Sequence, residues 1–471
     1  MRTKNDMLRM LRDGEQMTQR EKLRLVSLLS VPAMLGQLST IVMQYIDAMM
    51  VGHLGASASA SIGLVSTTTW LFSGLAASFG AGFSVLVAQR IGAKRNMEAC
   101  HIIHRAVVFC LIFAAVVALV CVSIHHVLPV WLGGQGNVVT QARSYFLTWA
   151  LALPLMLLFH LACSMLRASG NMATPMVINI LMCVLDVGLN SLFIPLWGVM
   201  GAALATASAG AICAAIALVY LVRLKHALGR VPSAPPSDTH RVAKKSNGIV
   251  RQALHIGFPM AVEHVVFCLA QIVCTIIVAP LGTVAVAANA IGITVESLCY
   301  MPGYGIGEAA TTLIGQSIGA HRSDLVRSFS IHTMAVGMVA MTLLGIVMYV
   351  FAPELMQFMS IDADVQRVGT EALRIEAYAE PMYAASIVAY GIFVGAGDTI
   401  VPCVINLSTI WLVRIPLAWW LASTMGLKGV WLAMCIELCV RGTIFIIRLK
   451  MNERKPQKQN IPNHSTTLPE T

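Results

Sequence analysis

The sequence is poor in charged residues. Only 11% of its 471 residues are Asp, Glu, Lys or Arg, whereas 57% are apolar, and its mean hydropathy is +0.75. An average soluble domain has about 25% charged residues. So little charge cannot cover the surface of one or two soluble domains of this length, and this excludes most classes of soluble enzyme.

Several short motifs are also missing. The chain has no GxxxxGK[ST] phosphate loop, no HExxH zinc motif and no CxxC pair, and its basic residues form no stripe interleaved with aromatic residues. It also has no recognisable nucleophile and base on adjoining helix ends. We therefore expect no cofactor, no metal, no nucleic-acid partner and no enzyme activity. The 12 cysteines lie mostly in apolar runs and are interpreted as small buried hydrophobic residues.

Long apolar runs fill most of the chain instead. A helix that crosses a bilayer needs roughly 20 apolar residues, and such runs predict an all-α polytopic membrane protein with about 12 transmembrane helices. The expected spans are 25–50, 57–82, 103–125, 144–166, 173–195, 200–222, 252–279, 284–310, 329–352, 372–394, 400–423 and 428–449.

A polar, proline-rich stretch separates the first six spans from the last six. Residues 231–238 read VPSAPPSD, and basic residues follow them, a composition that cannot cross a membrane. The expected domains are a cytoplasmic N-terminal segment (1–24), a first six-helix bundle (25–222), a cytoplasmic linker (223–251), a second six-helix bundle (252–449) and a cytoplasmic polar tail (450–471).

The positions of the basic residues indicate the orientation. With the N-terminus inside, 26 of the 32 Lys and Arg fall on the cytoplasmic side, four fall outside, and two, Arg414 and Arg441, lie within spans. Because short cytoplasmic loops carry an excess of Lys and Arg, we expect a multi-pass protein of the plasma (inner) membrane with both termini in the cytoplasm. The first apolar run lacks a cleavage pattern, so no removable signal peptide is expected.

The two halves are related in sequence by an offset of 227 residues, without a gap. The matched segments are QRIGA (89–93) with QSIGA (316–320), PMVIN (175–179) with PCVIN (402–406), Pro32 with Pro259, Gln44 with Gln271, and Gly170 with Gly397. Since six spans is an even number, both halves enter the membrane in the same orientation. This predicts two parallel repeats around a central cavity, a known transporter architecture.

Five segments carry a resemblance to a known family. They are YIDAMMVGHLG (45–55), QRIGAKR (89–95), LRASGN (166–171), GAALAT (201–206) and MPGYGIGEAATTLIGQ (301–316). Over roughly 25–450 the chain resembles the multidrug and toxic compound extrusion (MATE) family, and its last segment is similar to the DinF-like branch. The resemblance implies an antiporter that expels drugs in exchange for sodium ions or protons.

Three polar residues of the first half are candidates for ion coupling, because a carboxylate within a bilayer span is costly. Asp47 lies toward the outer end of the first span, and its repeat partner is the neutral Cys274. Asp186 and Asn190 lie one helical turn apart on one face of the fifth span. The resemblance implies a cation or proton site made of these residues and a Thr of the sixth span, best matched by Thr206, although the family order of Asn before Asp is reversed here.

Each of these candidates also has a structural explanation. Asp47 can be a solvated residue at a helix end, and Asp186 with Asn190 can form a hydrogen-bonded pair that only fixes helix packing. Thr206 can serve packing alone.

The second half offers weaker candidates. In the other branch of the family, acids of the seventh and tenth helices couple transport, but the matching positions here are Phe267 and Tyr383, which supply no carboxylate. Coupling is therefore expected in the first half. Glu263, Glu296 and Glu308 are candidates for the substrate cavity, because a negative charge in a low dielectric attracts a cation. The alternative for each of them is a structural role, either as a Glu at a helix end or as a neutral Glu that is hydrogen-bonded within the protein.

Arg414 and Glu437 favour a structural interpretation. Each lies about ten residues from the turn that joins the last two spans, hence at similar depth, and we expect an ion pair that locks these helices together.

Together these observations predict a cation-coupled efflux antiporter for organic, cationic and amphiphilic compounds, working as a monomer in the lipid bilayer. The coupling ion, Na⁺ or H⁺, stays open. A flippase for a lipid-linked precursor is the alternative, since it shares such helix bundles, but it requires a cationic cavity for a pyrophosphate and only two Arg lie within spans.

Overall fold

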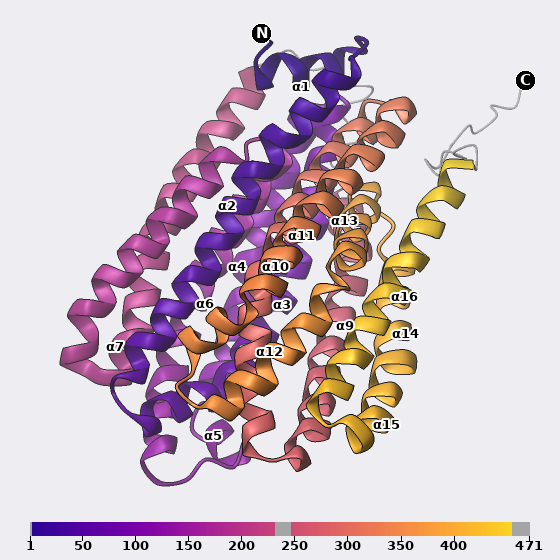
Figure 1. The fold of residues 1–471 in the computed structure, drawn as a ribbon. Helices are drawn as coiled ribbons and strands as arrows, with labels where there is room; N and C mark the ends of the chain where they lie inside the picture. The colour runs from indigo at the N-terminus through magenta and orange to yellow at the C-terminus, as the bar shows by residue number, and fades with distance from the viewer. Residues whose placement is uncertain (1, 231–245, 455–471) are drawn as a thin grey trace, which may run out of the picture.

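The computed structural model describes residues 2–230 and 246–454, and all regular structure in these ranges is helical. The centre of the predicted linker and most of the predicted tail lie outside the described residues. Long helices run side by side along one axis, with helix α1 and the C-terminal end of helix α16 at the same end of the molecule (Figure 1). We refer to this as the α1 end.

Within the described residues, the first half of the chain forms seven helices. They are α1 (Lys4–Asp13), α2 (Gln19–Gly52), α3 (Ala56–Gly92), α4 (Asn96–Ile124), α5 (Leu128–Trp131), α6 (Gly136–Ala168) and α7 (Ala173–Arg230).

The part of the second half that the structure describes forms eight α-helices, a short 3-10 turn and a π-helical turn. They are α9 (Ser246–Val278), η1 (Ala279–Leu281), α10 (Thr283–Gly319), α11 (Ser323–Met359), α12 (Ala363–Ala377), α13 (Glu380–Ala396), α14 (Ile400–Thr409), η2 (Ile410–Arg414), α15 (Ile415–Met425) and α16 (Leu427–Arg454).

The described helices account for the twelve predicted spans. Ten segments are long and apolar enough to cross a membrane, and α12 with α13, bent by 59°, forms a further candidate. Helix α7 is counted once but contains two spans, because its backbone leaves the helical conformation at Gly198 (φ 55°, ψ −132°). A positive φ is readily adopted only by glycine, which explains the break there. The predicted all-α architecture is confirmed.

The repeat predicted from the sequence is present in the backbone. Residues with positive φ recur at the 227-residue offset, and the break at Gly198 recurs one residue beyond that offset, at Gly426, with nearly the same angles (φ 59°, ψ −139°). The equivalent pairs are Gly55 (φ 104°) with Gly282 (98°), Lys94 (58°) with His321 (57°), and Gly170 (90°) with Gly397 (83°). The two halves therefore share their turns as well as their helices, as expected for parallel repeats.

The two bundles meet closely at the α1 end. There α3 crosses α10, and a Cβ on Gly92 would lie 2.0 Å from the carbonyl oxygen of Gln316. In the symmetric contact, a Cβ on Gly319 would lie 1.9 Å from the carbonyl oxygen of Gln89. Both pairs obey the repeat offset, so the crossing lies on the pseudo-twofold axis. Only glycine permits backbones to approach this closely.

Helix α1 lies across this crossing as a short amphipathic helix. It begins at a capping box in which Thr3 and Asp6 bond reciprocally, and it ends at Gly14 with φ 82°. One face is buried in the core shared with α2, α10 and α11 and consists of Met7, Leu8, Met10 and Leu11.

Polar contacts tie α1 to both bundles. The Arg12 Nη2 donates to the carbonyl oxygen of Ser169 in the first bundle (3.3 Å) and to Gln316 Oε1 in the second (3.1 Å). Asp13 forms an ion pair with Lys94 (2.6 Å). Burial lowers the pKa of Arg12 to about 10, which is still well above neutral pH, so the guanidinium keeps its charge. The N-terminal segment thus braces the two halves against each other.

Candidate functional site

One amide joins the two candidate carboxylates of the first bundle. The Asn190 Nδ2 donates to Asp47 Oδ1 (2.7 Å) and to Asp186 Oδ2 (2.9 Å). Asp186 and Asn190 are fully buried, whereas Asp47 is partly exposed. The structure therefore brings together the three residues that the sequence analysis singled out on two different helices.

Regular helix geometry explains this arrangement. Asp186 and Asn190 follow each other by one turn on α7, and α2 runs parallel to α7 beside them. Three turns earlier on both helices, Asn179 Nδ2 donates to the carbonyl oxygen of Gly36 (3.4 Å). A Cβ on Gly36 would lie 3.4 Å from that amide nitrogen, so the two helices are in van der Waals contact at this point. This close pairing sets the register that puts Asp47 opposite Asn190.

The site has spare acceptor atoms. Asp186 Oδ1 and Asn190 Oδ1 are buried without a hydrogen-bond partner. A buried acceptor without a donor is costly, and a buried carboxylate requires a proton or a positive charge nearby. Carboxylate and amide oxygens are also the ligands that hard cations prefer. The three side chains can thus take up a proton or a small cation.

Thr206 does not join this group through a hydrogen bond in the described structure. Its hydroxyl donates to the carbonyl oxygen of Ala202 in its own helix (3.2 Å). A residue that the sequence analysis missed is Tyr145 of α6, which packs against the apolar cluster that contains Val51 and Ile194, each one turn beyond a site residue. No pattern along the chain pointed to it, because α6 is adjacent to the site only in the folded protein.

In the second bundle Glu263 occupies the place of Gly36. The Asn406 Nδ2 donates to its Oε1 (2.6 Å) and the Tyr390 hydroxyl to its Oε2 (2.8 Å). Asn406 is the repeat partner of Asn179, so an equivalent contact between helices uses a carboxylate here in place of a backbone carbonyl. Glu263 is thus a satisfied group that ties α9 to α13 and α14.

Glu308 also links helices. Its Oε1 lies 3.3 Å from Arg167 Nη2 of α6 and accepts a hydrogen bond from Gln37 Nε2 of α2 (3.2 Å). Both partners belong to the first bundle, whereas Glu308 is on α10 of the second. This carboxylate therefore holds the two bundles together near the α1 end.

Three further carboxylates are buried in the second bundle. Glu296 is buried on α10, and Glu376 and Glu380 are buried where α12 meets α13. Both carboxyl oxygens of Glu376 and of Glu380 lack a hydrogen-bond partner. The sequence analysis selected Glu296 but not the other two. Their position four residues apart within the predicted span 372–394 was the available signal.

Arg414 and Glu437 form the ion pair that the sequence suggests. Arg414 Nε and Nη2 both donate to Glu437 Oε2, at 3.1 and 2.7 Å. The structure adds a third member, since Arg441 Nε lies 3.3 Å from Glu437 Oε1. Arg441 follows Glu437 by one turn of α16, and its guanidinium lies over the ring of Tyr383 at 5.5 Å. Two guanidinium groups therefore share one buried carboxylate.

Comparison with known proteins decides the family. The model of the MatE family matches residues 32–192 and 259–420, one match in each half. The chain belongs to the MatE family. The two matches coincide with the two bundles, so each repeat carries the family's pattern.

Relatives of this MatE protein are named as multidrug resistance proteins. It is 26% identical to the probable multidrug resistance protein NorM of Thermotoga maritima, over 89% of this chain and 90% of the relative. It is 23% identical to the multidrug resistance protein MdtK of Edwardsiella ictaluri, over 91% of this chain and 95% of the relative.

Solved structures share the fold of this MatE protein. The Vibrio cholerae MATE transporter VcmN in its bent form superimposes with a TM-score of 0.83 at 21% identity, covering 93% of this chain and 98% of that one. An outward-facing multidrug resistance MATE family transporter gives 0.86 at 19% identity, covering 95% and 97%. With ten to eleven apolar helices among the residues described, the MatE protein is an integral membrane protein.

Proposed function

We propose that this MatE protein is a multidrug efflux antiporter that exports organic compounds in exchange for Na⁺ or H⁺. The observation that carries the proposal is the first-bundle site, where Asn190 bridges Asp47 and Asp186 while acceptor oxygens remain unpartnered. Intramembrane carboxylates of this kind mark ion or proton pathways. The names of the relatives support the class of substrate.

The close crossing of α3 and α10 suggests which state the structure represents. We place the α1 end in the cytoplasm, as the distribution of Lys and Arg indicates. The bundles then meet on the cytoplasmic side, as expected for a transporter that is closed to the cell interior. Export requires a second state in which Gly92 and Gly319 separate. An ion drives the exchange only if it binds the two states with different affinities.

The first-bundle site provides such a difference. Binding of a proton or Na⁺ to Asp47 and Asp186 neutralises charge between α2 and α7 and supplies the missing partner for the free oxygens. Because Asp47 is partly exposed and Asp186 is fully buried, the ion reaches Asp47 first. A cationic drug held by these carboxylates is then released as they are neutralised.

The flippase alternative is less well supported. A pyrophosphate headgroup needs several free cationic side chains in the cavity. Arg414 and Arg441 lie within spans, but both are ion-paired to Glu437. Arg167 is likewise paired to Glu308.

Export from liposomes tests the proposed function. Purified protein is reconstituted with a fluorescent cationic dye, and a sodium gradient and a proton gradient are imposed separately. We expect one gradient to drive export by the wild type and Asp47→Asn to abolish it. Asp364→Asn is the matched control, because Asp364 is an exposed residue at the start of α12. A correctly folded Asp47→Asn protein with wild-type export would refute the mechanism.

A further inference from the structure

The first bundle carries a pocket of about 280 Å³ where the beginning of α4 meets the end of α7. It is lined by Met97, Cys100, His101, His104 and Lys225. Both segments lie at the α1 end of the molecule, and Figure 1 shows α7 rising to this end beside α1. The pocket is separate from the carboxylate site of the same bundle, because the two share no residue.

The pocket is suited to an anion. The ammonium group of Lys225 is a positive charge, and the imidazoles of His101 and His104 each offer at least one N–H donor. All three residues are exposed, and none of the lining residues is acidic. Glu98, the one acid of α4, forms ion pairs with two neighbouring arginines instead. The cationic and donor groups of the pocket are therefore not neutralised by a carboxylate from their own helix.

Close packing of the two helices fixes the floor of the pocket. The Cys100 thiol donates to the backbone carbonyl oxygen of Lys225 (3.4 Å), which ties α4 to α7 at the pocket. Cys100 is buried together with Leu221 and Leu228 of α7 in the core of the first bundle. The backbone below the polar side chains is thus held in place, while the side chains themselves remain accessible.

An apolar stripe leads from the pocket along the outside of α4. Its members share one face of the helix, since they are spaced by one or two turns. They are His101, His104, Val108, Ile112 and Leu119, and all are exposed. In an integral membrane protein such an exposed apolar face contacts the acyl chains of lipids. The polar pocket therefore continues directly into a lipid-facing surface.

The equivalent face of the second bundle lacks these histidines. The 227-residue offset places His101 on Ser328 and His104 on Ile331, both on α11. Helix packing that the two repeats share therefore does not require a histidine at either position. The excess of Lys and Arg in cytoplasmic loops accounts for a lysine at a helix end, but not for two histidines at the head of a lipid-facing stripe.

We propose that this pocket binds the headgroup phosphate of an anionic phospholipid, held by Lys225 and the two histidines, with one acyl chain along the stripe on α4. Basic pockets between transmembrane helices at the membrane surface bind such headgroups. A lipid fits better than a free phosphate, because the stripe offers an apolar surface that only an acyl chain can use. The assignment needs only that the protein lies in a membrane, so it does not depend on antiport.

Native mass spectrometry of the detergent-purified protein tests this assignment. The protein is incubated with dioleoylphosphatidylglycerol, which is anionic, or with the zwitterionic dioleoylphosphatidylcholine, and the retained lipid is measured. We expect the wild type to retain more of the anionic lipid. Lys225→Gln should lower this retention about fivefold, the loss expected for one lysine near an anionic headgroup.

A second variant tests the histidines. The double substitution His101→Ser and His104→Ile installs the residues found at the equivalent positions of α11 and should also lower retention of the anionic lipid several-fold. Lys450→Gln is the matched control, because Lys450 is exposed at the same end of α16, the repeat equivalent of the last part of α7, and does not line the pocket. It should retain the lipid like the wild type. Unchanged retention of phosphatidylcholine shows that each variant is folded.

Glycerol phosphate separates the two sources of the phosphate group. It carries the phosphate without acyl chains, so an excess of it should leave the bound lipid in place. Displacement of the lipid would indicate a site for soluble phosphate compounds and would overturn the lipid assignment. Equal retention of the two lipids by the wild type, or unchanged retention in both pocket variants, would overturn it as well.

Discussion

The crossing of α3 and α10 makes a sharp prediction for Gly92→Ala. The new Cβ would lie 2.0 Å from the Gln316 carbonyl oxygen and 2.7 Å from its carbonyl carbon, and both are backbone atoms that no rotamer change can move away. Restoring an ordinary contact requires the two helices to separate by about 1 Å or more. Overpacking of this kind costs typically about 1–3 kcal/mol.

That cost falls on the state in which the helices touch. If the alternative state separates them, the equilibrium shifts by roughly 5- to 150-fold toward it. We therefore expect Gly92→Ala to fold and reach the membrane, yet to export dye much more slowly than the wild type. Gly319→Ala meets the Gln89 carbonyl oxygen at 1.9 Å and should behave in the same way.

Hydrogen–deuterium exchange measured by mass spectrometry checks the conformational part of this prediction. Amides at the C-terminal ends of α3 and α10 should exchange faster in both variants, because the crossing no longer protects them. Gly63→Ala is the control on the same helix, since a Cβ there meets nothing within 4 Å. Wild-type export and wild-type exchange in Gly92→Ala would refute the reasoning.

Three further predictions concern the buried polar groups. Arg12→Ala removes the bonds from α1 to both bundles, each worth roughly 1.5–3 kcal/mol for a charged donor, so exchange across residues 4–13 should accelerate about tenfold or more. Glu437→Gln leaves two buried guanidinium groups uncompensated and should lower the free energy of unfolding by about 3–5 kcal/mol. The measurement is the midpoint of thermal unfolding, which should fall. As the control for Glu437→Gln, Glu371→Gln breaks the exposed pair with Lys428 and should lower the free energy of unfolding by under about 1 kcal/mol. Glu380→Gln should change the unfolding midpoint little, because the amide has nearly the same shape as the carboxyl group that it replaces in this buried position; a fall of several degrees would refute this.

Much of the architecture was predictable from the chain alone. The length of the apolar runs sets the number of spans, because each must cross the same hydrocarbon thickness. The repeat offset predicted the parallel halves, and the structure reproduces it down to the turns at Gly55 and Gly282. The spacing of Asp186 and Asn190 put both on one face of one helix, because that relation depends only on helix geometry.

Contacts between helices were decided by the tertiary structure. A helix that is apolar all round does not encode which face meets which neighbour, so the chain alone could not show that Asn190 also reaches Asp47 on α2. For the same reason Thr206 bonds within its own helix, and Glu308 links the two bundles rather than lining an open cavity. The burial of Glu376 and Glu380 likewise depends on how α12 and α13 rotate against their neighbours.

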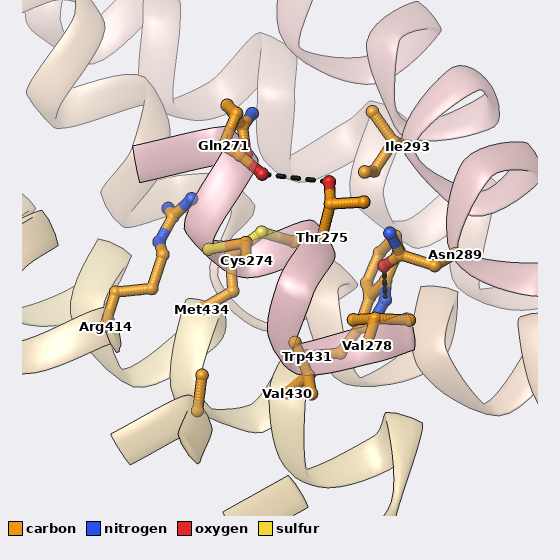
Figure 2. A pocket seen from close by; sticks show the side chains of 11 residues that line it. Gln271, Cys274, Thr275, Val278, Asn289, Ile293, Arg414, Val430, Trp431 and Met434 are labelled. Carbon is orange, nitrogen blue, oxygen red and sulfur yellow. Dashed lines mark hydrogen bonds between the residues drawn. The ribbon is translucent and has the colours of Figure 1, made fainter. Parts of the chain in front are cut away.

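The relation between equivalent positions of the two bundles depends on both the sequence and the fold. The sequence determined that Cys274 occupies the place of Asp47 and that Arg414 falls beside the place of Asp186, because the repeat offset carries the register of one helix to its equivalent. The fold decided that these positions line a cavity (Figure 2), to which Trp431 contributes from α16, a helix that begins more than 100 residues after α10 ends. Register is a property of the chain, whereas enclosure arises only when separate helices pack.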